Sequence, residues 1–176
     1  MAKPKLTDFR KYLSSLDEAG VRAELEKLFK KLPQVKEFYA QELMSEKDRL
    51  AMLEDYKKKI KNQYWTRSGN PRMPDNRKIN QILSGFEKVS VFPHELIDLL
   101  LFRVETASDF ANNFGGMPDA AYNSASRTFE KAVKLMAKHQ LVEMFKPRCS
   151  ALFEYDNLDY WYLEEMQEFF EDEIGG

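Results

Sequence analysis

The chain has 176 residues, of which 43% are hydrophobic and 32% are charged, and its formal net charge is −2. This length fits one domain that needs no disulfide or metal to fold, and the single cysteine excludes a disulfide within the chain. The longest apolar run, residues 99–102, is far too short to span a membrane, and the first residues lack the apolar core of a signal peptide. We therefore expect one cytoplasmic domain over residues 1–176.

The first predicted helices come from apolar residues spaced three and four apart. Such spacing over residues 21–32 predicts an amphipathic helix. Ser15 and Glu18 before it have the spacing of a capping box. Pro33 ends this helix or opens the next, and Ser45 is expected to cap a long helix after that.

A predicted loop divides this part of the chain from the central helix. Residues 66–75 hold two prolines and a Gly-Asn pair, which predicts an exposed loop. Helical spacing returns over residues 79–89, and Pro93 suits the first turn of a helix that is apolar nearly all round to about Phe114. We expect this helix to be buried as the central element, with glycines stopping it.

Three further apolar patterns complete the chain. Residues 122–136 predict one helix, and residues 142–152 continue the pattern past Pro147, which should kink or divide that segment. The C-terminal helix, about residues 157–173, is rich in acidic and aromatic side chains. Because no segment alternates apolar and polar residues over a sustained run, strand content should be minimal.

The sequence thus predicts an all-α domain of about seven or eight helices. Residues 27–38 match residues 134–145 at five of twelve positions, a weak match that leaves a short α-solenoid-like stack of helical hairpins as one option. Helix-turn-helix units share such patterning by default, so a multi-helix bundle stays an alternative.

The order of features from Ile60 onward is more specific than any one of them. An aromatic pair at 64–65 leads into a loop rich in Arg and Lys, and a short helix and the helix beginning at Pro93 follow. The runs 120–133 and 141–148 come next. In this order and spacing the chain resembles the small bacterial proteins of domain-of-unknown-function family 6155. The resemblance implies a bacterial, cytoplasmic, helical protein, and it implies no activity and no site residues.

The small net charge conceals two opposite segments. The basic segment, residues 57–78, holds eight basic side chains and one acidic side chain. Guanidinium groups bind phosphate through paired hydrogen bonds and aromatic rings stack on bases, so this segment is a candidate nucleic-acid or phosphate site. Its candidate residues are Tyr64, Trp65, Arg67, Arg72, Arg77 and Lys78. The alternative is a solvated helix end with a mobile loop.

The acidic segment, residues 154–173, holds nine acidic side chains and no basic one. Together with its aromatic residues it could dock a basic protein, a second copy of the chain, or the basic segment itself. The candidate partner-binding residues are Trp161, Glu164, Glu165 and Glu168. The alternative is an ordinary amphipathic helix with an acidic outer face.

Two weaker candidates lie elsewhere. A polar stripe on the central helix could serve acid–base chemistry or hold a divalent metal, although we favour a solvent-facing edge. Its members are His94, Asp98, Glu105, Asp109 and Asn113. Cys149 lies on an apolar stripe, so we expect a buried small hydrophobe rather than a catalytic thiol paired with His139. Phosphate-loop, dinucleotide-binding, nucleophile-elbow and zinc spacings are absent from the sequence.

From these observations we expect a non-enzymatic protein-interaction module with an unidentified protein partner, and a homodimer is one option. Nucleic-acid or phosphate-ligand binding through residues 57–78 is the alternative, and an enzyme using the polar stripe comes third. We expect no cofactor, no metal and no membrane partner.

Overall fold

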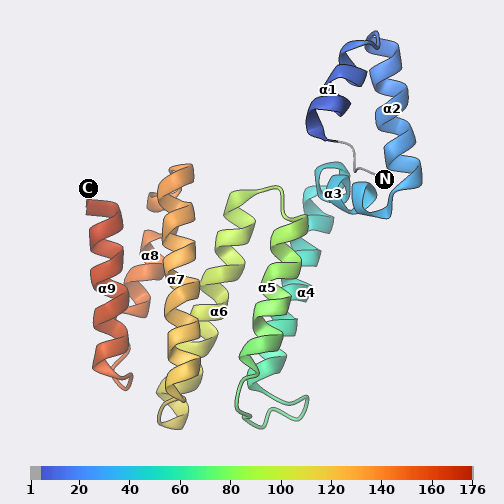
Figure 1. Cartoon of the computed structure of the whole chain (residues 1–176). Coiled ribbons are helices and arrows are strands. Elements are labelled where there is room, and N and C mark those ends of the chain that lie inside the picture. The colour runs from blue at the N-terminus through green and yellow to red at the C-terminus, as the bar shows by residue number, and fades with distance from the viewer. Residues whose placement is uncertain (1–4, 176) are drawn as a thin grey trace. The chain divides into compact units, whose positions relative to one another are not determined.

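The computed structural model describes residues 5–175, without the side chains of Glu37 and Gln41. Over that range the chain forms nine α-helices and no strand, which confirms the predicted all-α class (Figure 1). Nine helices exceed the predicted seven or eight because a short first helix, α1 (Leu6–Ser14), precedes the first one that the apolar spacing indicated. None of the described helices has the length and apolar character needed to cross a membrane.

The chain divides into two compact units, Met1–Leu43 and Met44–Gly176. The first unit contains α1, α2 (Glu18–Lys31) and α3 (Pro33–Leu43), and no residue of α1 or α2 is buried. The division into two units does not test the predicted single domain over residues 1–176, which stays a prediction.

The capping box predicted at Ser15 is wrong. Asp17 is the N-cap of α2, and its Oδ1 accepts a hydrogen bond from Gly20 N at 2.8 Å. Ser15 instead follows the end of α1, where its hydroxyl donates to Tyr12 O at 2.6 Å. Pro33 is the first residue of α3, which is one of the two roles predicted for it.

The second unit contains the remaining helices. They are α4 (Glu46–Tyr64), α5 (Asn76–Val89), α6 (Pro93–Phe114), α7 (Asp119–His139), α8 (Val142–Leu152) and α9 (Tyr160–Gly175). Ser45 caps α4 as predicted, because its hydroxyl accepts from Asp48 N at 3.2 Å. Gly115 ends α6 with φ 76°, a left-handed conformation that suits a residue without Cβ.

The helices of the second unit follow one another in chain order across it. α4 packs on α5 and α6, α6 packs on α7, and α7 packs on α9, while α8 contacts both α6 and α7. Within this unit, Figure 1 shows α9 at one edge and α4 with α5 at the other. The basic segment and the acidic helix therefore lie at opposite edges of the stack.

The core of this unit centres on α6, as its apolar pattern predicted. Twelve residues of α6 are buried, among them Leu99, Leu100 and Leu101. The predicted loop is exposed from Thr66 to Met73. Because α6 packs against neighbours on several sides, a charged side chain buried on it is costly unless a partner satisfies it.

Pro147 does not divide its segment, since α8 runs through this residue from Val142 to Leu152, and the kink that was the other predicted effect stays a prediction. Pro147 lies just over one turn from the start of α8, so it removes only the hydrogen bond to the carbonyl of Glu143. Glu143 is exposed, and its carbonyl can be hydrated instead.

Candidate functional site

The basic segment does not form one continuous patch. Tyr64 is fully buried, with its ring 5.6 Å from that of Phe110, so it offers no face to a ligand. Trp65 is half-buried and Arg67 is exposed. The aromatic pair predicted as a stacking platform is thus divided between the core and the surface.

Three other predicted members of the basic segment have local roles or separate positions. Arg72 folds back onto the end of α4, where its Nε donates to Gln63 O at 3.2 Å and its Nη2 donates to Asn62 O. These are carbonyls that a helix end leaves without partners. Lys78 pairs with Asp75 at 3.3 Å, and Arg77 is exposed on α5.

Trp65 and Arg67 do line a concave site. A groove of about 650 Å³ lies between the 66–75 loop and α6, with Trp65, Arg67 and Lys61 lining it from one side. Asp109 and Asn113 of α6 also line it. The groove therefore joins part of the basic segment to the far end of the polar stripe.

Two members of the polar stripe, Asp98 and Glu105, belong to an ion cluster between helices. Arg148 of α8 bonds Glu105 through Nε at 2.6 Å and Nη2 at 2.7 Å, and its Nη1 lies 2.6 Å from Asp98 Oδ1. Lys57 of α4 contacts the other oxygen of Asp98 at 2.9 Å. Burial lowers the pKa of Lys57, but its hydrogen bonds to Asp98 and Glu54 outweigh burial and leave that pKa raised. The cluster joins α4, α6 and α8, so the carboxylates of Asp98 and Glu105 have a structural role.

The remaining stripe residues offer no catalytic arrangement. Asp109 accepts a hydrogen bond from the hydroxyl of Tyr155, whose pKa is raised by burial and by that bond. Asn113 Nδ2 donates to Asp109 O at 2.7 Å, and His94 is exposed beside the Phe92 ring. Within residues 5–175, no three His, Cys, Asp or Glu side chains are grouped so that they could hold a metal ion.

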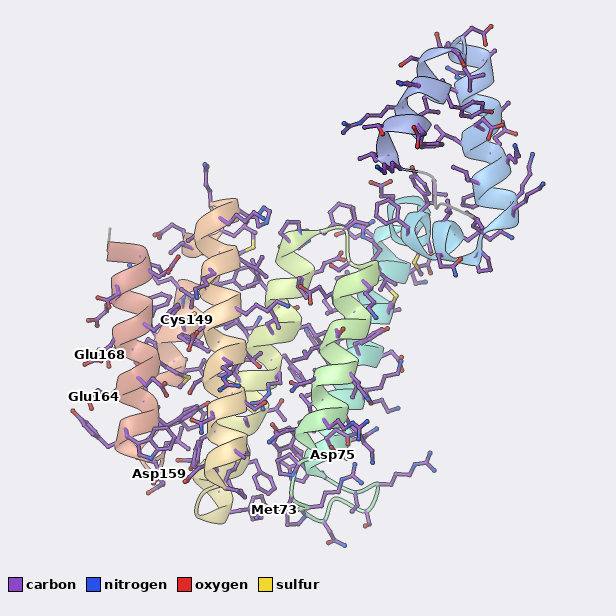
Figure 2. The ribbon with its side chains drawn as sticks, viewed as in Figure 1. Met73, Asp75, Cys149, Asp159, Glu164 and Glu168 are labelled. Carbon is purple, nitrogen blue, oxygen red and sulfur yellow. The ribbon has the colours of Figure 1, made fainter. Side chains whose placement is uncertain are left out.

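Cys149 is buried on α8, as its place on an apolar stripe predicted (Figure 2). Burial raises the pKa of its thiol to about 12. A nucleophilic cysteine needs a lowered pKa and solvent access, and Cys149 has neither.

The acidic segment keeps its charge unpaired. No acidic side chain of residues 154–173 forms an ion pair with any described residue. By contrast, three lysines of the basic segment pair with nearby acids: Lys57, Lys59 and Lys78. The α9 edge therefore carries a concentration of negative charge that no ion pair with a described residue offsets.

A groove lies between the end of α8 and the outer side of α9. It holds about 420 Å³, has Phe153 and Leu163 as apolar lining, and has Glu164 and Glu168 among its acidic members. Figure 2 shows Glu164 and Glu168 on the side of α9 that faces away from α7. They are two of the four predicted partner-binding residues.

The other two predicted partner-binding residues lie elsewhere on α9. Trp161 is 42% exposed, and its ring packs edge-on against Tyr122 at 5.4 Å. Glu165 accepts from Ser126 Oγ of α7 at 3.1 Å and so faces the helix interface. Glu165 is thus hydrogen-bonded across the interface of α7 and α9, whereas the hydrogen bond that Glu164 accepts from Tyr160 lies within α9.

Sequence reasoning missed Arg103, the largest fully buried side chain. It lies on α6 with no exposed surface, and its one hydrogen bond to a described residue runs from Nη2 to Ser124 Oγ at 3.3 Å. Arg103 is visible in the sequence as an exception to the apolar pattern, because it interrupts the apolar run of the central helix directly after Phe102. The one Lys or Arg of this helix, set within its most apolar stretch, was the available indication.

Comparison with known protein families gives a match over nearly the whole chain. The family described as Family of unknown function (DUF6155) matches residues 2–172. The chain belongs to this family. No curated protein and no solved structure matches it.

The DUF6155 match extends over the two units alike. It includes the basic segment, the ion cluster around Asp98 and nearly all of α9. The family description assigns no activity.

Proposed function

We propose that this DUF6155 protein is a cytoplasmic, non-enzymatic protein-interaction module that docks a basic partner on the outer side of α9. The observation that carries the proposal is the unpaired negative charge around the α9 groove. Charged side chains without an intramolecular ion pair are available to attract and orient a second protein of opposite charge.

The chemistry of the groove fits a partner segment with both apolar and basic side chains. Phe153 and Leu163 would take an apolar side chain, and Glu164 and Glu168 would pair with Lys or Arg beside it. An apolar centre with a charged rim is the usual anatomy of a protein interface. An amphipathic basic helix would match this pattern.

The first unit supports the same class of function. Seven of its large apolar side chains are exposed: Leu6, Phe9, Tyr12, Leu25, Leu32, Phe38 and Leu43. Because α1 and α2 bury no residue, these helices have apolar stripes without a core of their own. Exposed apolar surface of this kind is typical of proteins that bind other proteins.

The test compares two double variants of the full chain. Glu164→Lys with Glu168→Lys reverses two groove charges, and Asp172→Lys with Glu173→Lys makes the same charge change on the same helix outside the groove. Tagged wild-type and variant proteins are used to capture partners at low salt, and captured proteins are identified by mass spectrometry.

We expect a basic protein to be captured by the wild type and by the Asp172/Glu173 variant, and to be lost with the Glu164/Glu168 variant. Its capture should also weaken as salt is raised, since exposed charges are screened. Equal capture by both variants would exclude the α9 groove as the docking site.

The groove beside Trp65 favours a second candidate function, the binding of nucleic acid or a phosphate ligand. An exposed arginine and an aromatic ring line one concave site, with Lys61 beside them. If this site binds nucleic acid, affinity in a mobility-shift titration should fall steeply with salt and should be lost in Arg67→Ala. No shift at low salt would remove this candidate.

A further inference from the structure

A third groove, between α5 and α7, is lined mainly by polar residues. It holds about 660 Å³ and is lined by Asn80 and Ser84 from α5 and by Asn123, Ser124 and Arg127 from α7. Leu83 and Leu100 supply apolar lining, and Leu100 comes from the buried helix α6. Side-chain amides, hydroxyls and a guanidinium thus converge on one cavity large enough for a small molecule.

Arg103 lies directly behind this groove. It follows Leu100 by three residues on α6, so the two side chains project from the same face of the helix. Its Nη2 donates to Ser124 Oγ at 3.3 Å, and Ser124 is itself part of the groove lining. The buried guanidinium is therefore one hydrogen bond away from the groove.

No described residue neutralises the charge of Arg103. Its Nε and Nη1 are buried without a hydrogen-bond partner, and it belongs to no ion pair. A buried charge without a counterion is strongly unfavourable. An anion bound against Ser124 would supply the missing negative charge.

The remaining charges of the groove indicate a dianion. Arg127 is exposed and forms no ion pair with a described residue, whereas Lys131 is neutralised by Glu87 at 2.6 Å. One guanidinium without an ion pair, Arg127, therefore lines the cavity, and a second, Arg103, lies behind the lining residue Ser124. At its end, Asn76 Nδ2 donates to Ala120 O at 3.2 Å while its buried Oδ1 has no partner.

We propose that the α5–α7 groove binds a small phosphate monoester with a neutral, hydroxyl-bearing body. The phosphate would contact Arg127 and Ser124, with Arg103 behind them balancing its second charge, because guanidinium groups bind phosphate oxygens strongly. The amides of Asn80 and Asn123 would bind the hydroxyl groups of the body. This site is separate from the protein-docking groove on α9.

The test titrates the full chain with three probes at constant ionic strength and follows the melting temperature. The probes are glycerol 3-phosphate, succinate as a carboxylate dianion, and glycerol. Glycerol 3-phosphate should raise the melting temperature in a saturable way, because a ligand that binds only the folded state stabilises it. Glycerol should have no effect, and succinate should bind more weakly than glycerol 3-phosphate.

Variants then locate the bound phosphate. Arg127→Ala and Arg103→Met should each weaken binding of glycerol 3-phosphate about tenfold or more, since each removes a charged hydrogen-bond donor or its field. Arg67→Ala, which removes an exposed arginine outside this groove, should leave affinity unchanged. If Arg103→Met does not fold, Ser124→Ala replaces it, because Ser124 contacts Arg103 and lines the groove.

Three results would overturn the proposal. They are the absence of saturable binding by glycerol 3-phosphate, affinity that is unchanged in Arg127→Ala, and loss of binding in Arg67→Ala. Tighter binding of succinate than of glycerol 3-phosphate would overturn the assignment to phosphate monoesters.

Discussion

Arg103 Nη2 and Ser124 Oγ, 3.3 Å apart, form the single hydrogen bond between a fully buried guanidinium and the described chain. One bond to a neutral hydroxyl recovers little of the hydration that a charged group loses on burial. Arg103 is therefore expected to destabilise the fold when no anion is bound.

The first prediction follows directly. Arg103→Met should raise the free energy of unfolding by about 1 kcal/mol or more, because an apolar side chain of similar length removes the cost of a buried charge. Urea denaturation in a phosphate-free buffer measures this. Arg103→Ala is the control, since it leaves a cavity and should lower stability. A loss of stability in Arg103→Met would mean that the guanidinium holds the fold together.

The second prediction concerns the ion cluster around Arg148. Arg148→Ala should lower the free energy of unfolding by roughly 2 kcal/mol, because Asp98 and Glu105 both lose a charged hydrogen-bond partner in a partly buried site. Lys59→Ala is the matched control, as its pair with Asp55 is about half exposed and should contribute less than about 0.5 kcal/mol. If urea denaturation showed equal losses of unfolding free energy in Arg148→Ala and Lys59→Ala, a structural role for the cluster would be contradicted.

The third prediction is a fall in stability at alkaline pH. Burial raises the pKa of Tyr162 to about 12, whereas the unfolded side chain titrates near its ordinary value of 10.0. Above that ordinary value the unfolded state loses the proton first, so stability is complete below pH 10 and falls toward pH 12. Tyr162 should account for about 1 kcal/mol of the loss between pH 9 and about pH 11.

Tyr162→Phe isolates this contribution. Urea melts at the two pH values should show a smaller loss in Tyr162→Phe than in the wild type. Ser108→Ala removes the 3.4 Å contact of the Tyr162 hydroxyl but keeps the titrating group, so it should retain the full pH dependence. An identical pH dependence in Tyr162→Phe and wild type would show that Tyr162 does not titrate in this way.

The fourth prediction contrasts two phenylalanines. Phe86 has no exposed surface, so Phe86→Ala should lower the stability of the second unit by about 3–5 kcal/mol. Phe38 is 54% exposed in the first unit, so Phe38→Ala should change the melting of the second unit by less than about 0.5 kcal/mol. Phe38→Ala should also reduce binding of a hydrophobic dye, and unchanged dye binding would count against an exposed apolar surface there.

Most helices were predictable because their signals are local. Ser45, Pro93 and Gly115 act within a turn or two of their own positions, and the apolar spacing of α6 directly reports its burial. The first helix was missed because α1 has only nine residues, and Ser15 beyond its end then resembled an N-cap. Local patterns cannot distinguish the residue that ends one helix from the residue that begins the next.

The candidate sites were less predictable because they depend on pairing across the fold. The sequence displays nine acidic residues near the C-terminus, but only the structure shows that none of them forms an ion pair with a described residue. Arg148 and Asp98 are 50 residues apart in the chain, so no spacing rule connects them. The burial of Tyr64 and the folding back of Arg72 depend likewise on contacts that composition does not encode.

Arg148 has one more consequence, for the alignment of α8 on α6. Asp98 and Glu105 are seven residues apart, about two helical turns or 10 Å along α6, and Arg148 contacts both. If α8 slid by one turn, Arg148 would lose at least one carboxylate, whereas the apolar side chains of the two helices could pack again in the shifted position. The arginine thereby selects one axial register among several that hydrophobic contact alone would permit.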